Sequence, residues 1–229
     1  IGVDGDYAPV LDRPAPNSDQ IVGDRAYGND PDMIAELGAA ALAGLTAGGV
    51  AGCIKHMPGH GRAEADSHLA LPRVTASREQ LAFDIAPFSA LREAPSAMTA
   101  HIVYEALDPD RPATCSPLVI EEIIRGKIGF QGLLMSDDLD MKALDEAGLG
   151  GLRERARAAL SAGCDVVLQC SGEMDDMYEA VSGCEVLSGI SLVRARALEA
   201  FAKRAPREFD AEAGWARLRE LLAREPVVA

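Results

Sequence analysis

The feature that most constrains the fold is the alternation of short apolar runs with helical segments along the chain. The runs stay apolar instead of alternating with polar residues, as in strands that are covered on both faces. Five of them are predicted as strands: Asp4–Leu11, Val50–Lys55, Ala97–His101, Gly132–Ser136 and Asp165–Gln169. Strands that alternate with helices form a parallel sheet, because each helix carries the chain back to the start of the next strand. The sequence therefore predicts an α/β fold.

Residues typical of helix ends support this alternation. Asp30 before Pro31 predicts an N-cap followed by the first helical residue, and Gly48 predicts the end of the same helix. Ser77 and Gln80 fit a capping box, in which each side chain binds the backbone N–H of the other residue. One helix is thus predicted after residue 30 and another after residue 77.

Further helices are predicted downstream. Pro87 is placed in the first turn of a second helical piece that runs to Glu93, because proline is poorly tolerated deeper in a helix. Ser116 and Pro117 open another helix, and Leu152–Ala162 forms one that stops at the glycine after it. Residues 174–224 are expected to be mostly helical. The residues available for one buried face there are Leu192, Val193 and Phe201.

Polar residues gather where the predicted strands end. They are Asp4, Lys55, His56, His101, Asp137 and Asp138. Functional residues at the carboxyl ends of successive parallel strands are typical of a TIM (β/α)8 barrel. A doubly wound sheet is the competing fold, but no Gly-x-Gly-x-x-Gly follows a predicted strand. We therefore expect a TIM barrel.

The first residues of the chain qualify that expectation. The chain begins with Ile1, at the edge of a predicted strand, and its five strands are fewer than the eight of a closed barrel. We expect residues 1–229 to form a single catalytic domain that is N-terminally incomplete and lacks its first strands. Such a chain is expected to be a poor enzyme by itself.

Composition excludes several classes of partner. The net charge of −14 argues against nucleic acid, because phosphate binding needs clustered Lys and Arg. No run reaches the roughly 18 apolar residues of a membrane span, so no membrane is expected. The five cysteines are odd in number and include no Cys-x-x-Cys, which disfavours structural zinc and a disulfide framework. Reduced thiols in the cytoplasm are the simpler interpretation.

The segment Lys55–Leu71 is the densest in reactive side chains and holds three of the four histidines. One interpretation is a metal site formed by His56, His60, Asp66 and His68, all of them good ligands. Another is a proton shuttle, in which the Asp66 carboxylate accepts a hydrogen bond from one nitrogen of His68 and raises the basicity of the other. Spacing alone leaves both open. The glycines on either side of His60 are expected to let the loop move over a substrate.

A second reactive segment is Leu133–Met141, in which an apolar strand ends at Asp137 and Asp138. Adjacent strand residues point to opposite sides, so one of the two faces the mouth of the barrel. The strand-end position favours a functional role for Asp137 and helix capping for Asp138.

These motifs carry a family resemblance. KHMPGHG, ADSH and SDDLDM together resemble glycoside hydrolase family 3, specifically its bacterial β-N-acetylglucosaminidases of cell-wall recycling. YAPVLD, GDRAYGND, TAHIVY and AGCDVVL extend the similarity over roughly residues 1–170. The resemblance implies retaining hydrolysis of terminal β-linked N-acetylglucosamine from peptidoglycan-derived muropeptides. It also implies a monomer without cofactor or metal, whose one partner is the carbohydrate substrate.

The resemblance further assigns roles to residues. Asp137 is the nucleophile that forms a covalent glycosyl-enzyme, His68 is the general acid/base, and Asp66 orients it. The substrate-binding residues that it implies are Arg25, Lys55 and His56, which bind sugar hydroxyls, and His60 and His101, which line the site.

Three departures from the family pattern stand out. Met57 replaces the usual Phe after Lys-His, and Asp140 replaces the Ser that is common before Met141. An early Asp-Gln-Glu-Gly-Gly-Arg-like segment, which supplies further sugar ligands, is absent, so substrate binding by this chain is expected to be weak. Neutral His68 does not repel an anion, so phosphate in place of water as the acceptor is a further alternative within the same family. The alternatives are a metal-dependent hydrolase on a similar barrel and a truncated family member without turnover.

Overall fold

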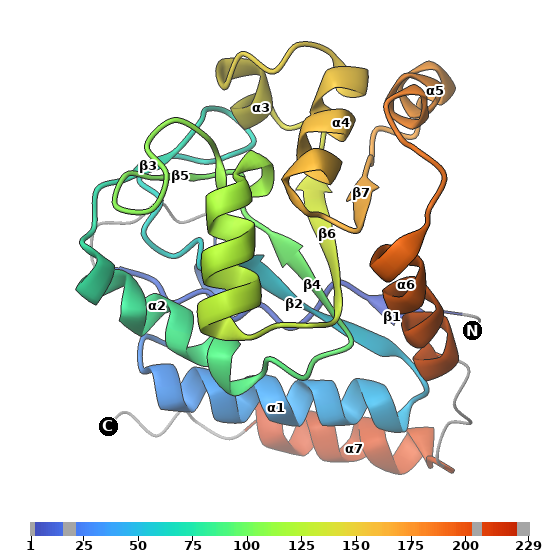
Figure 1. Cartoon of the computed structure of the whole chain (residues 1–229). Coiled ribbons are helices and arrows are strands. Elements are labelled where there is room, and N and C mark those ends of the chain that lie inside the picture. Colours follow the sequence, from blue (N-terminus) through green and yellow to red (C-terminus); the bar gives the residue numbers. More distant parts are fainter. Residues whose placement is uncertain (1–2, 16–21, 203–207, 224–229) are drawn as a thin grey trace.

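The computed structural model describes residues 3–15, 22–202 and 208–223. Five parallel strands form its main sheet, shown in Figure 1. In sheet order they are β1 (Gly5–Asp6), β2 (Ala51–Met57), β4 (Ser96–Thr99), β6 (Leu133–Asp138) and β7 (Val166–Leu168). Each overlaps one of the five predicted runs, so the predicted parallel α/β sheet is confirmed. A small second sheet, β3 (Arg73–Val74) with β5 (Val103–Tyr104), was not predicted.

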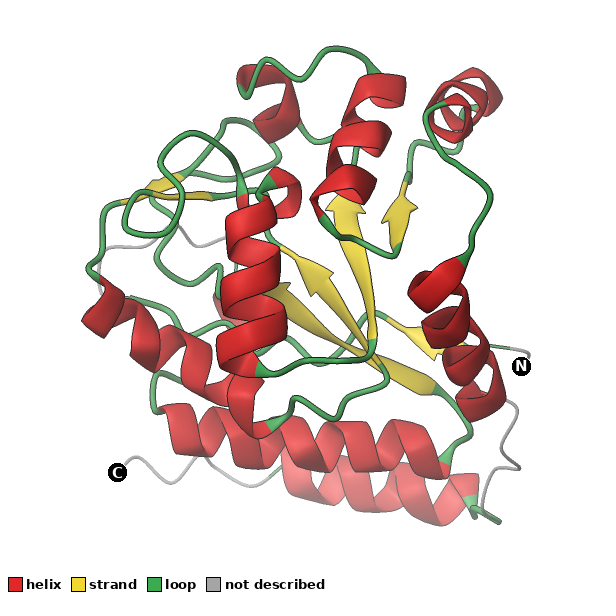
Figure 2. Ribbon diagram, in the orientation of Figure 1, coloured by secondary structure: helices red, strands yellow, loops and turns green. Residues whose placement is uncertain are grey.

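The winding of the main sheet is that of a barrel wall. Its strands lie side by side in chain order, without the reversal of a doubly wound sheet. The helices that pack together on one face are α1 (Pro31–Ala47), α2 (Arg78–Ala90), η3 (Val119–Ile128, wound as a π-helix) and α4 (Leu152–Ala162), as Figure 2 shows. Within the described residues the sheet is open, with edges at β1 and β7, so the closed eight-stranded barrel is not confirmed for this chain.

The two faces of the sheet are packed separately. Ile54, Ala97 and Leu134 point into the main core beneath the four helices. Cys53, Met98, Leu133 and Met135 point to the other, inner face and form a second cluster. Helix α6 (Gly189–Ala202) covers that cluster with two of its half-buried side chains, which are Ala195 and Leu198.

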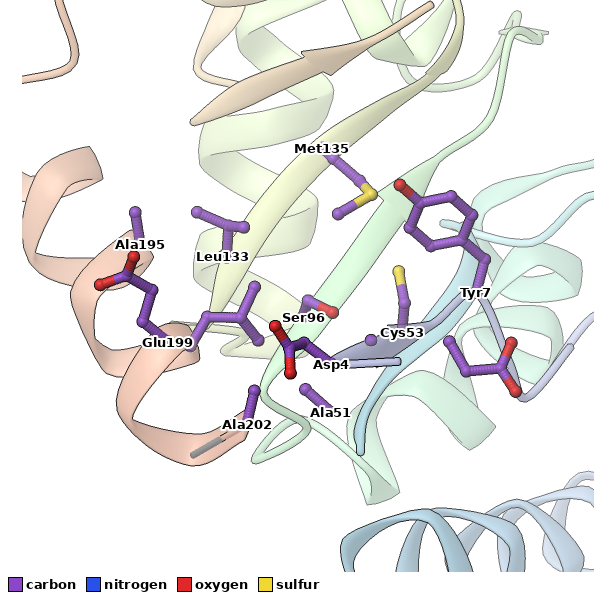
Figure 3. Close-up of a pocket in the computed structure, with 13 residues that line it drawn as sticks. Asp4, Tyr7, Ala51, Cys53, Ser96, Leu133, Met135, Ala195, Glu199 and Ala202 are labelled. Carbon is purple, nitrogen blue, oxygen red and sulfur yellow. The ribbon is translucent and has the colours of Figure 1, made fainter. Parts of the chain in front are cut away.

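Helix α6 leaves a cavity of about 470 Å³ against the inner face, at the amino ends of the strands. Figure 3 shows Leu133 and Ser96 from the sheet facing Ala195 and Glu199 of α6. The expected buried face of this region is wrong. No residue of α6, which is wholly described, is fully buried, and Val193 is 61 % exposed. Leu192 and Phe201 are half-buried.

The predicted helix ends are largely confirmed. Asp30 Oδ1 accepts hydrogen bonds from the backbone N–H groups of residues 32 and 33, both at 2.9 Å. Ser77 and Gln80 form the capping box, and Gly163 ends α4 with a left-handed φ of 118°. The break predicted at Pro87 is wrong, because α2 runs unbroken through it. Pro87 lies in the last turns of α2 and is buried with Ile85 and Phe88, and this packing outweighs the loss of one backbone hydrogen bond.

Two 3-10 helices and three α-helices complete the described chain. They are η1 (Gly23–Arg25), η2 (Ala113–Cys115), α3 (Lys142–Glu146), α5 (Met174–Ser182) and α7 (Ala211–Leu222). Among the described residues, no helix has the length and apolar character that crossing a bilayer requires.

Candidate active site

A cavity of about 120 Å³ lies at the carboxyl ends of β2 and β6. It is lined by Val22, Arg25, Lys55, His56, His60, Ser67, His68 and Asp137. The structure thus brings six of the residues predicted for the site to one wall, from segments more than 100 residues apart. The 470 Å³ cavity at the opposite end of the strands contains none of them. Parallel strands explain the gathering, because their carboxyl ends meet at one edge of the sheet.

Asp137 is the penultimate residue of β6, and its side chain is 17 % exposed. Its Oδ1 accepts a hydrogen bond of 2.8 Å from the backbone N–H of Asp138, and its Oδ2 lies 3.9 Å from His56 Nε2. Burial raises the pKa of Asp137, but His56, His101 and the backbone N–H of Asp138 outweigh burial and lower the pKa below its usual value. The carboxylate is therefore ionised at neutral pH, as a nucleophile must be.

Asp138 has a different environment. Its Oδ1 accepts hydrogen bonds from the backbone N–H groups of Asp140, at 3.2 Å, and Cys170, at 3.1 Å. These bonds tie the turn before α3 to the loop that follows β7. The helix capping predicted for Asp138 is wrong, because α3 has Met141 at its N-cap with no side-chain hydrogen bond. Asp138 instead holds the turn that contains the exposed Asp140.

A buried carboxylate that the sequence interpretation missed, Asp12, organises the wall of the cavity. It is 0 % exposed and receives three hydrogen bonds. Its Oδ1 accepts from the backbone N–H groups of His56, at 3.1 Å, and His60, at 2.6 Å, while its Oδ2 lies 2.6 Å from His56 Nδ1. Burial raises the pKa of Asp12, but the two histidines outweigh it and lower the pKa. Because a carboxylate only accepts, Nδ1 of His56 carries the proton and Nε2 faces Asp137.

His60 is almost fully buried beside this carboxylate. Its Nε2 lies 3.0 Å from Ser67 Oγ, whereas its Nδ1 is buried and has no hydrogen-bond partner in the part of the chain that is described. Burial lowers the pKa of His60, so the ring is neutral near pH 7. The Nδ1 nitrogen has almost no accessible surface, so it lies inside the wall and is not open to the cavity.

Asp66 and His68 form the predicted pair on an exposed loop. Asp66 Oδ1 lies 2.8 Å from His68 Nδ1 and accepts a second hydrogen bond of 2.8 Å from the His68 backbone N–H. The side chain of His68 is 63 % exposed, so it is open to a ligand in the cavity. Burial raises the pKa of Asp66, but the two hydrogen bonds from His68 together outweigh burial and lower the pKa. The contact fixes the proton on Nδ1 and leaves Nε2 for exchange.

His101 is not brought to the cavity. It is 0 % exposed, with Nδ1 2.7 Å from Thr114 Oγ1 and Nε2 2.9 Å from the carbonyl oxygen of Asp138. Burial lowers the pKa of His101, so it is neutral, and Nε2–H donates to that carbonyl. His101 therefore supports the backbone next to Asp137 from behind, which corrects its expected place in the lining.

The glycines of the His56–Arg62 segment serve close packing. A Cβ at Gly61 would lie 1.9 Å from the carbonyl oxygen of Arg13, and Gly59 has a φ of +136°. The carbonyl oxygen of Gly59 also accepts a hydrogen bond of 2.9 Å from the Tyr104 hydroxyl. These contacts hold the segment in place, so its glycines allow close packing and do not give the loop movement expected from the sequence.

The metal-site interpretation gains no support from the geometry. Among the described residues, no three His, Cys, Asp or Glu side chains are grouped closely enough to hold a metal ion. His56 and His60 are instead held by Asp12 and Ser67, and His68 by Asp66.

Known proteins resemble this chain in sequence and in structure. Residues 1–199 match the Glycosyl hydrolase family 3 N terminal domain. A β-hexosaminidase of Alkalilimnicola ehrlichii is 46 % identical over 173 residues, which are 74 % of this chain and 49 % of that protein. A β-hexosaminidase of Neisseria meningitidis is 44 % identical over 74 % of this chain and 47 % of its own length. The chain thus spans about half the length of these relatives.

Solved structures of glycoside hydrolase family 3 members also resemble this chain. A glycoside hydrolase family 3 β-N-acetylglucosaminidase from Paenibacillus superposes with a TM-score of 0.79 at 33 % identity, covering 90 % of this chain and 42 % of that one. NagZ from Neisseria gonorrhoeae in complex with N-trifluoroacetyl-D-glucosamine superposes with a TM-score of 0.76 at 36 % identity, covering 95 % of this chain and 61 % of its own.

Proposed function

Because the chain belongs to glycosyl hydrolase family 3 through the N-terminal domain of that family, we propose that it is a retaining β-N-acetylglucosaminidase. The observation that carries the proposal is the joint placement of Asp137 and His68 in one cavity. One is an ionised carboxylate at a strand end, and the other is an exposed imidazole oriented by Asp66. A retaining glycosidase needs a nucleophile and a proton donor of this kind.

The reaction proceeds in two steps. In the first, an Asp137 oxygen bonds to the anomeric carbon while the bond from that carbon to the leaving oxygen breaks, and doubly protonated His68 gives its Nε2 proton to the leaving oxygen. In the second, water attacks the anomeric carbon, His68 Nε2 takes the proton of the water, and Asp137 is released. Two inversions at the anomeric carbon leave the product in the β configuration.

The remaining lining residues bind the sugar. Arg25 and Lys55 supply cationic donors from η1 and β2, His56 Nε2 is a further group for sugar hydroxyls, and His60 completes the lining. The cavity of about 120 Å³ is smaller than the ~300 Å³ of a small ligand pocket. It therefore surrounds the reacting end of one sugar unit, and we expect slow turnover from this chain.

The substrate class and setting belong to the same proposal. N-trifluoroacetyl-D-glucosamine is bound by the related NagZ, which supports an N-acetylglucosamine unit as the sugar, and we place muropeptides among the natural substrates. We propose that the enzyme acts as a monomer in the cytoplasm. All five cysteines lie within the described residues and are free, as thiols are in a reducing compartment.

The proposal is tested with the 229-residue chain on 4-nitrophenyl β-N-acetylglucosaminide. We expect slow turnover that disappears in Asp137→Ala while the circular dichroism spectrum stays unchanged. A 2-fluoro sugar with a good leaving group is expected to label Asp137, which peptide mass spectrometry locates. Turnover no faster than that of Asp137→Ala would refute the proposal, and a label on Asp138 would refute the choice of nucleophile. Turnover that survives EDTA argues against the metal-dependent alternative.

A further inference from the structure

The loop that carries Asp66 and His68 is exposed, yet Ser67 and Leu71 within it form hydrogen bonds to two different parts of the fold. Ser67 lies between those two residues, and its side chain is buried, with 1 % exposure. Ser67 Oγ lies 3.0 Å from Nε2 of His60, whose backbone N–H is bound by Asp12. The loop is thereby attached to the wall formed by β2 and the residues after it.

The same loop is attached to the helix that follows the nucleophile strand. The carbonyl oxygen of Ser67 accepts a hydrogen bond of 3.2 Å from the backbone N–H of Ala143, in α3. The backbone N–H of Leu71 donates a hydrogen bond of 2.7 Å to Oε2 of Glu146, at the end of α3. Because α3 begins four residues after β6 ends, this contact sets the loop relative to Asp137.

We propose that Glu146 is a positioning residue, which docks the His68 loop on α3 and so fixes the distance between the proton donor and Asp137. This role rests on the proposed function. General acid catalysis requires the donor within hydrogen-bond reach of the leaving oxygen, and small displacements on a surface loop remove that reach. Glu146 is exposed and does not line the cavity, so it acts on His68 only through Leu71. Ser67 holds the same loop on its other side through its contact with His60.

The test compares Glu146→Ala with Glu146→Gln, whose side-chain oxygen still accepts from the Leu71 N–H. Glu122→Ala is the matched control, since Glu122 is also exposed on a helix but lies outside the site. We expect Glu146→Ala to lower kcat/KM about threefold to tenfold for a poor leaving group such as methyl, the effect of one hydrogen bond. For a dinitrophenyl leaving group, which needs little protonation, the loss is expected to stay below about twofold. Glu146→Gln is expected to restore most of the loss.

A second measurement does not depend on turnover. Amide hydrogen exchange across residues 66–71 is expected to quicken in Glu146→Ala and to remain as in the wild type in Glu146→Gln and Glu122→Ala. Ser67→Ala is expected to quicken exchange in the same residues and to show the same selective loss for poor leaving groups.

The outcomes separate the two proposals. Suppose that wild-type turnover depends on Asp137, but Glu146→Ala lowers kcat/KM equally for both leaving groups or does not lower it at all. The positioning role is then wrong, and the proposed function stands. If exchange in residues 66–71 is unchanged, Glu146 does not dock the loop. If Glu146→Ala quickens exchange while the wild type shows no turnover dependent on Asp137, the docking contact is real and the proposed function fails.

Discussion

Replacing Asp12 with Asn tests whether one buried carboxylate holds the catalytic wall together. Asp12 accepts three hydrogen bonds from His56 and His60 while fully buried. Removing the side chain in Asp12→Ala leaves three donors unpaired, at about 1–3 kcal/mol each, which is comparable with the ~5–15 kcal/mol stability of a whole domain. Asp12→Asn keeps the shape and one acceptor oxygen and loses the charge-assisted bond to His56 Nδ1. We expect it to lower the free energy of unfolding by about 1.5–3 kcal/mol.

Urea unfolding at pH 7 measures this difference, with Asp110→Asn as the control on an exposed aspartate. Activity supplies a second readout. Without the carboxylate the proton of His56 is no longer fixed on Nδ1, so we expect kcat/KM to fall beyond what the loss of folded protein explains. Nitrogen chemical shifts of labelled histidine show the tautomer of His56 directly. An unfolding free energy within about 0.5 kcal/mol of the control, the range of ordinary surface changes, would refute the reasoning.

The gap in unfolding free energy between the wild type and Asp12→Asn is expected to change with pH in one direction. The pKa of Asp12 is lowered in the folded protein, so its ionised form stabilises the fold above the ordinary aspartate pKa of about 3.9. This contribution is lost as the pH falls from there toward the lower folded pKa. Asp12→Asn has no such titration, so the stability gap between the two proteins is expected to narrow below about pH 4. A gap that stays constant down to complete unfolding contradicts this account.

Other predictions address the chemistry and the packing of the loop. His68→Ala is expected to lose far more kcat/KM on methyl than on dinitrophenyl glycosides, and Asp66→Asn to show a smaller loss of the same kind; equal losses contradict the acid role. The first-released sugar is expected to be the β-anomer by proton NMR, and an initial α-anomer excludes retention. Gly61→Ala is expected to lower the free energy of unfolding by several kcal/mol, because the new Cβ meets the carbonyl oxygen of Arg13. Gly44→Ala, in open space on α1, is expected to raise the free energy of unfolding by about 0.5–1 kcal/mol. Similar thermal midpoints for the two variants contradict this expectation.

Local signals predicted much of the fold. The helix ends at Asp30, Ser77 and Gly163 are determined by side chains within three residues, and the strands by short apolar runs, so the sequence alone locates them. Pro87 and the exposed Val193 were predicted wrongly, because the course of α2 and the packing of α6 depend on distant partners. Propensity is a weak guide where tertiary packing decides.

The residues of the site also fall into those that the sequence predicted and those that it missed. Asp137 and His56 could be predicted because the ends of parallel strands meet, a rule of topology that applies to any such sheet. Asp12 was missed because its partners lie 44 and 48 residues along the chain, and a carboxylate after two apolar residues gives no sign of them. The burial of His101 was missed for a related reason, since a strand-end position does not tell which side of the strand the ring faces.

The tightly packed glycine segment after β2 has a thermodynamic consequence for ligand binding. With its backbone in contact with Arg13 and Tyr104, this wall loses its conformational freedom when the protein folds, before any sugar arrives. A ligand that contacts His56 or His60 therefore meets a preorganised surface, and its affinity is not reduced by the entropy of ordering that surface. Sugars bound at this wall should show a small entropic penalty in calorimetry, and groups that reach toward His68 a larger one.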